Sequence, residues 1–235
     1  MEYKADALVL RTADYGEYDK MVTLLTAERG KIGVALKGVR RAGAKLKFAA
    51  QPFCFAEFVL AARSGRNTVA SAALHDGFYP LREDVVRYYA GMTVLSACDK
   101  VALEGMRSGE LLVSAVTALE EIVQDDPLAL LRFFLAALAF AGYPVSAGAC
   151  PVCGREPSGR MRFDFAGGSF LCGGCSEEGV PASESTYRAV RAAQGEGAAE
   201  PDGIVRALRL LGAYFSFQVG AELPELPEYL RLLRG

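Results

Sequence analysis

Four of the six cysteines form two pairs whose spacing suits a metal ion. Cys150 and Cys153 make one C-x-x-C pair, Cys172 and Cys175 make the other, and 18 residues separate the pairs. Each pair places two thiolates on one side of a tight turn, and two pairs supply four ligands for a tetrahedral site. Because four thiolates leave no open coordination position, the spacing predicts one structural zinc ion per chain, not a catalytic one. An iron–sulfur cluster uses the same ligands and stays an alternative.

A second chemical feature is a run of basic residues without any acid. Residues 29–56 hold seven lysines and arginines and no aspartate or glutamate. The densest part, called the basic segment below, contains Lys37, Arg40, Arg41, Lys45 and Lys47. Such side chains displace counterions from a phosphodiester chain, so the segment predicts nucleic-acid binding. Phe48, Phe53 and Phe55 follow it as candidate stacking residues, although core packing suits the last two better.

Residues suited to catalysis are few. The single histidine, His75, lies beside Asp76 at the end of a β-type segment, where a histidine is more often structural. The chain contains neither the nucleotide-binding pattern G-x-x-x-x-G-K-[ST] nor the acyl-transfer pattern G-x-S-x-G. Asp14, Glu17 and Asp19 could bind Mg²⁺, but their position between two β-type segments favours an exposed hairpin loop. We therefore expect no enzyme activity.

The elements that must position these residues begin with five short β-type segments. They cover residues 3–13, 20–27, 31–39, 52–62 and 68–74, with glycine and polar clusters between them. Five closely spaced strands predict a small barrel over residues 1–79. The basic segment then falls in the loop between the third and fourth strands.

Helical periodicity replaces the β-type pattern after Pro80. Apolar residues recur at three- and four-residue spacings and predict helices over residues 82–106, 110–124, 128–141, 183–193 and 201–219, with a last turn at 227–233. A segment rich in glycine and cysteine, about 147–180, interrupts them and contains both cysteine pairs. Within it, residues 161–165 and 169–171 predict a hairpin that brings the pairs together. The fold class is α+β, with an all-α domain over residues 80–235 that carries the metal site as an insertion.

Composition and charge fit a soluble protein with two differently charged halves. The 235 residues are 51% hydrophobic and 23% charged, which excludes general disorder. Residues 1–80 hold 12 lysines and arginines against 8 acids, whereas residues 81–235 hold 14 against 20. The N-terminus lacks the basic region of a signal peptide, and the longest apolar run, 128–142, is broken by Arg132. We expect a cytoplasmic protein whose thiols stay reduced.

Several motifs, in order along nearly the whole chain, resemble the RecO family of bacterial recombination mediators. In the first half they are Ala-Leu-Val-Leu-Arg-Thr at 7–12, Tyr15-Gly-Glu17 with Asp19, Leu-Thr-Ala-Glu-Arg-Gly-Lys at 25–31, Lys-Gly-Val-Arg-Arg at 37–41 and Gln51-Pro-Phe53. In the second half, both cysteine pairs and Gly167-Gly168 resemble the zinc-containing members. The resemblance implies an OB-fold followed by a helical domain that carries the zinc. It also implies binding of single- and double-stranded DNA and annealing of complementary strands, in association with the nucleoid.

The same resemblance implies protein partners. These are RecR and single-stranded-DNA-binding protein, with which the family helps to load RecA. Arg132 either reaches water or a carboxylate, or forms a cationic rim beside an apolar groove with neighbours one turn away, Leu128, Leu135 and Ala136. Such a groove would suit the acidic, aromatic-ended tail through which the family meets single-stranded-DNA-binding protein.

Two rival functions stay open. The first is an RNA-binding protein with the same barrel, which annealing assays on DNA and RNA would separate from a DNA-repair protein. The second, weaker rival is a Mg²⁺-dependent phosphodiesterase that uses Asp14, Glu17 and Asp19, which a nuclease assay would test. The favoured interpretation is a non-enzymatic DNA-repair protein that neutralises phosphates on two strands at once.

Overall fold

The computed structural model describes residues 2–63 and 65–233, which form two compact units. The first unit ends at Val123 and the second begins at Gln124. The first unit therefore contains helices as well as strands, and the domain boundary predicted at residues 79 and 80 stays a prediction. In the part of the chain that the structure describes, no helix has the length and apolar character needed to span a membrane.

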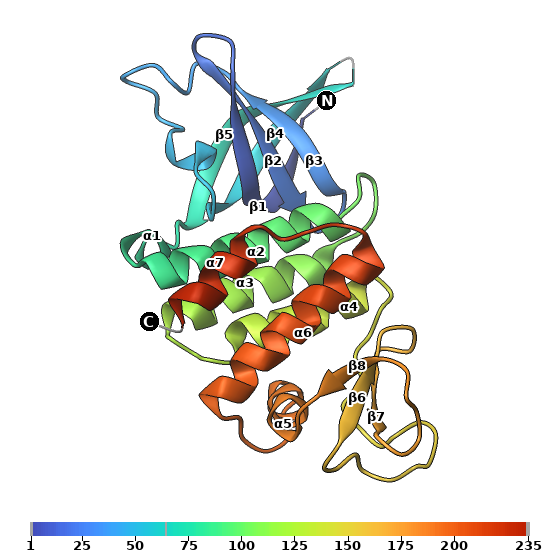
Figure 1. The fold of residues 1–235 in the computed structure, drawn as a ribbon. Coiled ribbons are helices and arrows are strands. Elements are labelled where there is room, and N and C mark those ends of the chain that lie inside the picture. Colours follow the sequence, from blue (N-terminus) through green and yellow to red (C-terminus); the bar gives the residue numbers. More distant parts are fainter. Residues whose placement is uncertain (1, 64, 234–235) are drawn as a thin grey trace. The chain divides into compact units, whose positions relative to one another are not determined.

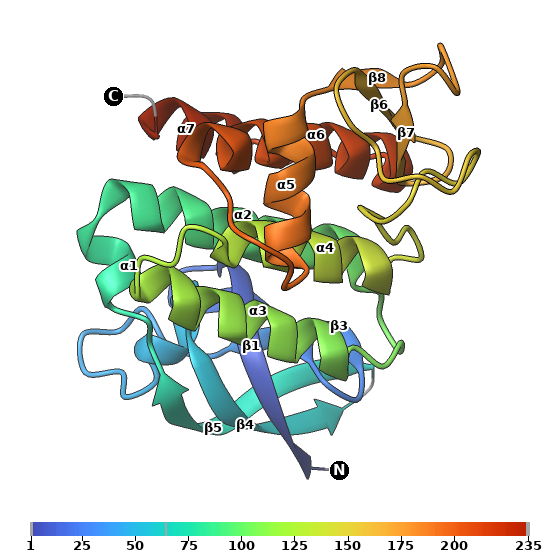
Figure 2. The same ribbon diagram turned by 90° about the horizontal axis from the view of Figure 1, so that it is seen from below.

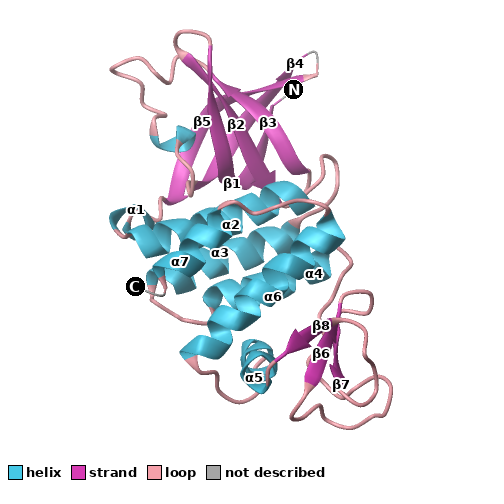
Figure 3. Ribbon diagram, viewed as in Figure 1, coloured by secondary structure: helices cyan, strands magenta, loops and turns pink. Residues whose placement is uncertain are grey.

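A closed barrel of five strands dominates the first unit (Figures 1 and 3). The strands are β1 (Glu2–Tyr15), β2 (Asp19–Thr26), β3 (Gly30–Leu36), β4 (Phe55–Arg63) and β5 (Arg66–Asp76). Their order around the barrel is β1-β2-β3-β5-β4, and β4 pairs with β1 to close it. Neighbouring strands are antiparallel except β3 and β5, whose parallel pairing is short, Val34 with Asn67 and Ala35 with Thr68. The predicted five-stranded barrel is confirmed.

Alternating side chains fill the barrel. On β3 the buried positions recur every second residue, as a half-buried strand requires, and they include Ile32, Val34 and Leu36. On β2 the same alternation holds for Val22 and Leu24, but the end of the strand is buried at every residue. The pairing of β4 with β5 shifts register next to Phe55 and again next to Leu60. Such irregularities increase the local bend of a strand, which a small barrel needs in order to close. The short helix η1 (Phe48–Ala50) covers the core from the loop before β4, with Ala49 and Ala50 buried.

Three helices complete the first unit. α1 (Pro80–Glu83) is a single turn, α2 (Val85–Val101) contacts β1, and α3 (Gly109–Val123) contacts β1 and β2. The sequence predicted one helix over residues 82–106, which is wrong at both ends and in the middle. Asp84 adopts an extended backbone, and its carboxylate accepts a hydrogen bond from the Arg87 N–H at 2.8 Å, so it caps α2 and separates it from α1.

The turn between β2 and β3 is bonded to the connection between α2 and α3. Gly30 has a φ of 62°, and a Cβ at this position would lie 2.0 Å from the carbonyl oxygen of Leu103. The N–H of Gly105 donates to the Arg29 carbonyl at 2.9 Å, and that of Ser108 to the Ala27 carbonyl at 2.8 Å. Only glycine allows this approach, so Gly30 fixes the α2–α3 connection against the barrel.

The second unit is built on four helices. They are α4 (Ala129–Phe140), α5 (Glu184–Ala193), α6 (Pro201–Val219) and α7 (Glu225–Leu232). α6 contacts the other three, and α5 crosses it (Figure 2). Phe134 of α4 and Phe215 of α6 meet edge to face at 6.1 Å between ring centroids. Gly220, with a φ of 69°, ends α6 in the left-handed conformation that favours glycine.

A small antiparallel sheet is inserted between α4 and α5. Its strands are β6 (Met161–Asp164), β7 (Ser169–Cys172) and β8 (Val180–Ala182), in the order β7-β6-β8. The predicted hairpin is confirmed as β6 and β7. β8 was not predicted, because a three-residue strand that contains a proline has no recognisable sequence pattern. Phe163 and Phe170 are buried and pack on Tyr214 and Tyr187, which attaches the sheet to α6 and α5.

Candidate metal centre and nucleic-acid interface

The β6–β7 hairpin brings the two cysteine pairs together. Met161 pairs with Cys172, so the second pair begins where β7 ends, and the first pair lies in the loop before β6. The sulfur atoms of Cys150, Cys153, Cys172 and Cys175 all lie within 4.8 Å of one another. Within residues 2–63 and 65–233 this is the only group of three or more histidine, cysteine, aspartate or glutamate side chains close enough to share a metal ion. The cluster could therefore hold a metal ion.

Backbone hydrogen bonds shape both turns for this purpose. In the first turn, the Gly154 N–H donates to the Cys150 carbonyl at 2.8 Å, and the Cys150 N–H to the Arg155 carbonyl at 2.8 Å. In the second, the Cys175 N–H donates to the Cys172 carbonyl at 2.9 Å. Gly173 is required there, because a Cβ would come within 2.7 Å of the Arg160 carbonyl. The turns hold the sulfur atoms in place through the main chain.

The chemistry of the four thiols fits a divalent cation. Hydrogen bonds from Arg155, its backbone N–H first, lower the pKa of Cys153 to about 6. The hydrogen bond with Cys153, together with burial, raises the pKa of Cys175 to about 12. Four crowded thiols cannot all ionise beside one another without a cation, and a bound metal ion supplies that charge.

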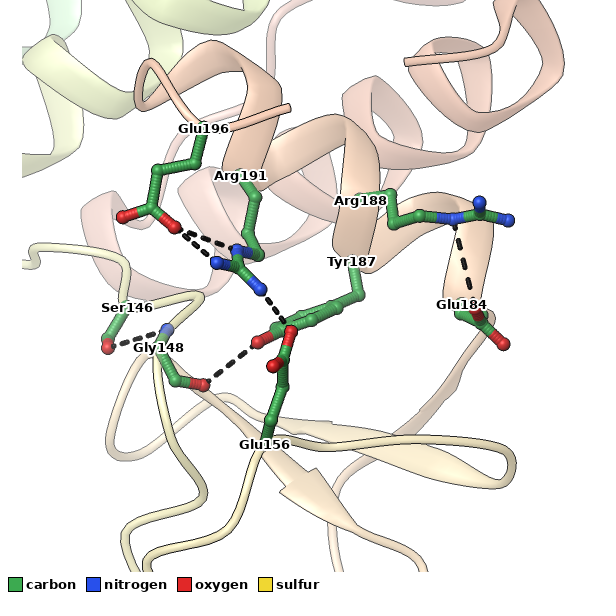
Figure 4. Close-up of polar contacts among 8 residues, drawn as sticks. All are labelled: Ser146, Gly148, Glu156, Glu184, Tyr187, Arg188, Arg191 and Glu196. Atoms are coloured by element: carbon green, nitrogen blue, oxygen red, sulfur yellow. Dashed lines mark hydrogen bonds and ion pairs between the residues drawn. The ribbon is translucent and has the colours of Figure 1, made fainter. Parts of the chain in front are cut away.

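Helix α5 supports the first cysteine pair from both sides (Figure 4). The Tyr187 hydroxyl donates to the Gly148 carbonyl at 3.2 Å, just before the pair. Arg191 forms ion pairs with Glu156, just after the pair, and with Glu196, to which its Nε donates at 3.0 Å. Residues on α5 therefore fix the loop that carries Cys150 and Cys153. This support could not be predicted from the sequence, because an ion pair between residues 35 apart leaves no local pattern.

The remaining two cysteines, Cys54 and Cys98, are both buried. Cys54 lies in the barrel core, and burial raises the pKa of its thiol to about 11. Cys98 lies on α2, where burial raises its pKa even further. Neither is a thiolate at neutral pH, so neither competes for metal.

All five basic-segment residues are exposed on the loop that leads from β3 to η1. Arg40 forms an ion pair with Asp14 at 3.2 Å, and the Arg41 guanidinium lies 4.8 Å from the ring centroid of Tyr18. These contacts attach the start of the loop to the β1–β2 turn. Lys47 donates to the Ala42 carbonyl at 2.7 Å and folds the loop back on itself. The segment is thus held in shape while its charges face solvent.

A groove on the barrel surface lies beside this loop. It encloses about 630 Å³ along the seam between β3 and β5, where the strand pairing is short. Its lining includes the basic residues Lys37, Arg63 and Arg66 and the aromatic residue Tyr15, together with two acids, Asp19 and Glu104. Tyr15, 57% exposed, and the two arginines were not among the DNA-binding residues predicted from the sequence, since they lie outside the basic run.

Three other groups of candidate residues make contacts within the fold. They are the acidic turn, the candidate stacking residues and His75. Asp14 pairs with Lys20 and Arg40, and Asp19 accepts the Gly38 N–H at 2.7 Å. Phe53 is fully buried and Phe55 half-buried, as core packing requires, and Phe48 packs against the barrel core. His75 contacts Asp6 at 2.7 Å and the ring of Phe55 at 5.0 Å.

Arg132, on α4, pairs with the carboxylate of Asp126, which lies just before that helix. Its guanidinium donates to Asp126, which also accepts the Leu128 N–H at 2.9 Å. Burial alone would raise the pKa of Asp126, but these two donors outweigh it and lower the pKa. Leu128, Leu135 and Ala136 are half-buried at helical spacing from Arg132, so the structure keeps all four at a partly exposed surface.

Comparison with known proteins gives matches over both units. Residues 1–78 match the family described as "Recombination protein O N terminal", and residues 82–227 match "Recombination protein O C terminal". The DNA repair protein RecO of Myxococcus xanthus is 33% identical over 237 residues, which cover 99% of this chain and 88% of the relative. That of Anaeromyxobacter dehalogenans is 36% identical, covering 76% of this chain and 72% of the relative. That of Bacillus pumilus is 31% identical, covering 81% and 76%.

Proposed function

The chain belongs to the RecO family of DNA repair proteins, and from this premise we propose that it binds DNA and anneals complementary strands without catalysing a reaction. The exposed basic segment is the observation that carries the proposal. Five lysines and arginines project from one loop of the barrel, in a chain whose second half carries more acids than bases. A one-signed patch of this kind raises the local concentration of polyanions.

The neighbouring groove suits a strand of nucleic acid. Lys37 belongs to both the basic segment and the groove, so a phosphodiester chain can pass from one to the other. Bound on one barrel, two complementary strands repel each other less, because lysine and arginine replace their counterions. Lower repulsion favours base pairing, which is the physical work we assign to this protein.

The metal centre has a supporting role in this proposal. Zinc fits the four thiols best, because it accepts tetrahedral sulfur ligands and needs no redox partner. Bound there, it would cross-link the two turns and stabilise the β6–β8 sheet. Cys150, Cys153, Cys172 and Cys175 are the proposed ligands, and their closed set leaves no position for a substrate.

Protein partners complete the proposal. As a cytoplasmic mediator associated with the nucleoid, the protein would act with RecR and with single-stranded-DNA-binding protein to help load the recombinase. The acidic tail of single-stranded-DNA-binding protein would bind at Arg132, where Leu128, Leu135 and Ala136 supply apolar surface. An arginine for the carboxylates beside an apolar site for the aromatic end is a common arrangement for such a tail.

The first test is charge reversal in the basic segment. A variant with glutamate at positions 37, 40, 41, 45 and 47 should lose DNA binding and annealing and keep its metal content. Fluorescence anisotropy with a labelled oligonucleotide measures the first, and a strand-annealing assay the second. Retention of wild-type affinity by this variant would overturn the proposal.

Matched variants separate a local effect from one of net charge. The test variant combines Lys45→Glu with Lys47→Glu. The control variant combines Lys100→Glu with Arg209→Glu, which changes the total charge by the same amount at exposed residues outside the segment. Only the first pair should weaken binding strongly. The same annealing assay with RNA strands tests the RNA-binding alternative, and a nuclease assay with Mg²⁺ and Mn²⁺ tests the phosphodiesterase.

A further inference from the structure

Two aromatic residues next to the basic segment adopt a backbone conformation that bulky side chains avoid. Phe53 has a φ of 68° and Phe78 a φ of 46°. Residues of this kind at positive φ are strained, and they persist only where the surrounding structure holds them. Phe53 follows the loop that carries the basic segment, and Phe78 lies between β5 and α1. Two strained turns therefore lie at the base of the barrel.

A single arginine holds both turns. The Arg82 side chain donates from Nη1 to the Gly77 carbonyl at 2.6 Å and from Nη2 to the Pro52 carbonyl. Each carbonyl belongs to the residue immediately before a strained phenylalanine. The guanidinium also lies 5.4 Å from the ring centroid of Phe53. Arg82 thus connects the end of the basic-segment loop to the start of α1.

The ring of Tyr79, which directly precedes α1, is exposed next to these two turns. Tyr79 is 60% exposed, although the Arg82 guanidinium lies 5.3 Å from its ring centroid. Its ring also fits against Gly77, where a Cβ would come within 2.9 Å of it. Tyr88 of α2 is 38% exposed and contacts Phe53 edge to face at 5.9 Å. The ring of Tyr79 is therefore held in place by its neighbours but is open to solvent.

Tyr79 directly precedes α1, so the position of α1 locates it relative to the basic segment. In both Figure 1 and Figure 2 the loop after β3 lies on the same side of the barrel as α1. Two nearby carboxylates are occupied by backbone N–H groups: Asp76 accepts from Phe78 at 2.7 Å and Asp84 from Arg87 at 2.8 Å. Fixed aromatic rings beside a basic loop are the features on which single-stranded nucleic acids stack their bases.

We propose that Tyr79, together with the exposed ring of Tyr88, is a base-stacking platform for single-stranded nucleic acid on the side of the barrel that carries the basic segment. This inference rests on the proposed DNA binding and adds a preference to it. A base in a duplex is already stacked on its neighbours, so the platform acts on unpaired strands only. A strand held along the basic segment by its phosphates places an unpaired base on the ring of Tyr79, which arranges the strand for pairing.

The test compares Tyr79→Ala with Tyr79→Phe, which keeps the aromatic ring, and with Tyr143→Ala, which removes a 36% exposed tyrosine from the second unit. Anisotropy with a labelled thymidine oligonucleotide and with a hairpin duplex gives both affinities, and 2-aminopurine in the strand reports stacking directly. Tyr79→Ala should bind the single strand about tenfold more weakly and bind the duplex as the wild type does. Tyr79→Phe and Tyr143→Ala should bind both like the wild type. Salt dependence should not change in Tyr79→Ala, because no phosphate contact is lost.

Other results overturn the platform in distinguishable ways. Wild-type single-strand affinity in Tyr79→Ala and in the double variant with Tyr88→Ala, while the five-residue charge reversal abolishes binding, would reject the platform and keep the proposed function. An equal loss for single strand and duplex would assign Tyr79 to the shape of the loop. Normal binding by the charge-reversal variant would reject both proposals. Circular dichroism confirms that each variant is folded.

Discussion

Asp126 is the residue that decides how Arg132 can act. A charged side chain on so apolar a helix needs water or a partner, and the carboxylate of Asp126 provides one. Both side chains are about one-third exposed, at 32% and 37%, so solvent weakens the pair and a competing carboxylate can reach it. In the proposed complex, an acidic peptide would compete with Asp126 for the guanidinium.

Substitutions at Arg132 and Asp126 should therefore change the affinity for the peptide in opposite directions. Arg132→Ala should weaken binding of the acidic tail peptide of single-stranded-DNA-binding protein by about tenfold, because a charge-assisted hydrogen bond is lost. Asp126→Asn should strengthen binding, because it removes one carboxylate that competes for the guanidinium and keeps an acceptor for the Leu128 N–H. Isothermal titration of the peptide measures both. Arg206→Ala, which removes another arginine paired with an aspartate, is the matched control and should not change the affinity. Equal affinities in all four proteins would leave Arg132 with its intramolecular ion pair alone.

At the scale of elements, periodicity and spacing predicted most of what the structure contains. The five strands, the helix over Pro201–Val219 and the β6–β7 hairpin were recognisable because each has a local pattern. The break at Asp84 was not, because a capping aspartate inside an apolar repeat looks like an exposed position of one long helix. β8 and the contacts of Arg191 depend on residues distant in the sequence. The four-cysteine cluster could be predicted from spacing alone, whereas the groove and the strained turns required the fold.

The β6–β8 sheet and its turns should depend on the metal ion. The strands of this sheet are only three or four residues long, and metal binding is coupled to folding in sites of this kind. One zinc ion per chain is expected by elemental analysis, and Cys172→Ser or treatment with a chelator should lower the melting temperature markedly. Iron in place of zinc would indicate the cluster alternative.

A substitution of a cysteine outside the cluster is the control that separates the effect of losing the metal from the effect of disrupting the core. Cys98→Ser also destabilises the protein, because it introduces a hydroxyl into a buried apolar site. It should keep its zinc, and a chelator should still lower its melting temperature. In Cys172→Ser, the chelator should have no further effect. A protein without metal, or Cys172→Ser with unchanged melting, would contradict the metal's structural role.

At the scale of the whole molecule, the distribution of charge matters more than its total. The formal net charge is −2, so the protein as a whole does not attract polyanions. Residues 1–80 nevertheless carry an excess of four positive charges, and residues 81–235 an excess of six negative ones. At physiological ionic strength, charges more than about 8 Å apart are largely screened, so a bound strand responds mainly to the basic segment.

The salt dependence of binding follows from this local attraction. If each of the five basic-segment residues contacts one phosphate, the logarithm of the affinity for a single strand should fall with the logarithm of the salt concentration at a slope of about −3.5. Lys45→Glu with Lys47→Glu should make the slope less steep by at least about 1.4, because two contacts and their counterions are lost. The Lys100→Glu and Arg209→Glu pair should leave the slope unchanged, since long-range charge alters affinity without releasing bound counterions. Anisotropy titrations at several salt concentrations give all three slopes. A wild-type slope near zero would mean that the exposed lysines and arginines are merely solvated, because no binding mode that neutralises phosphates is insensitive to salt.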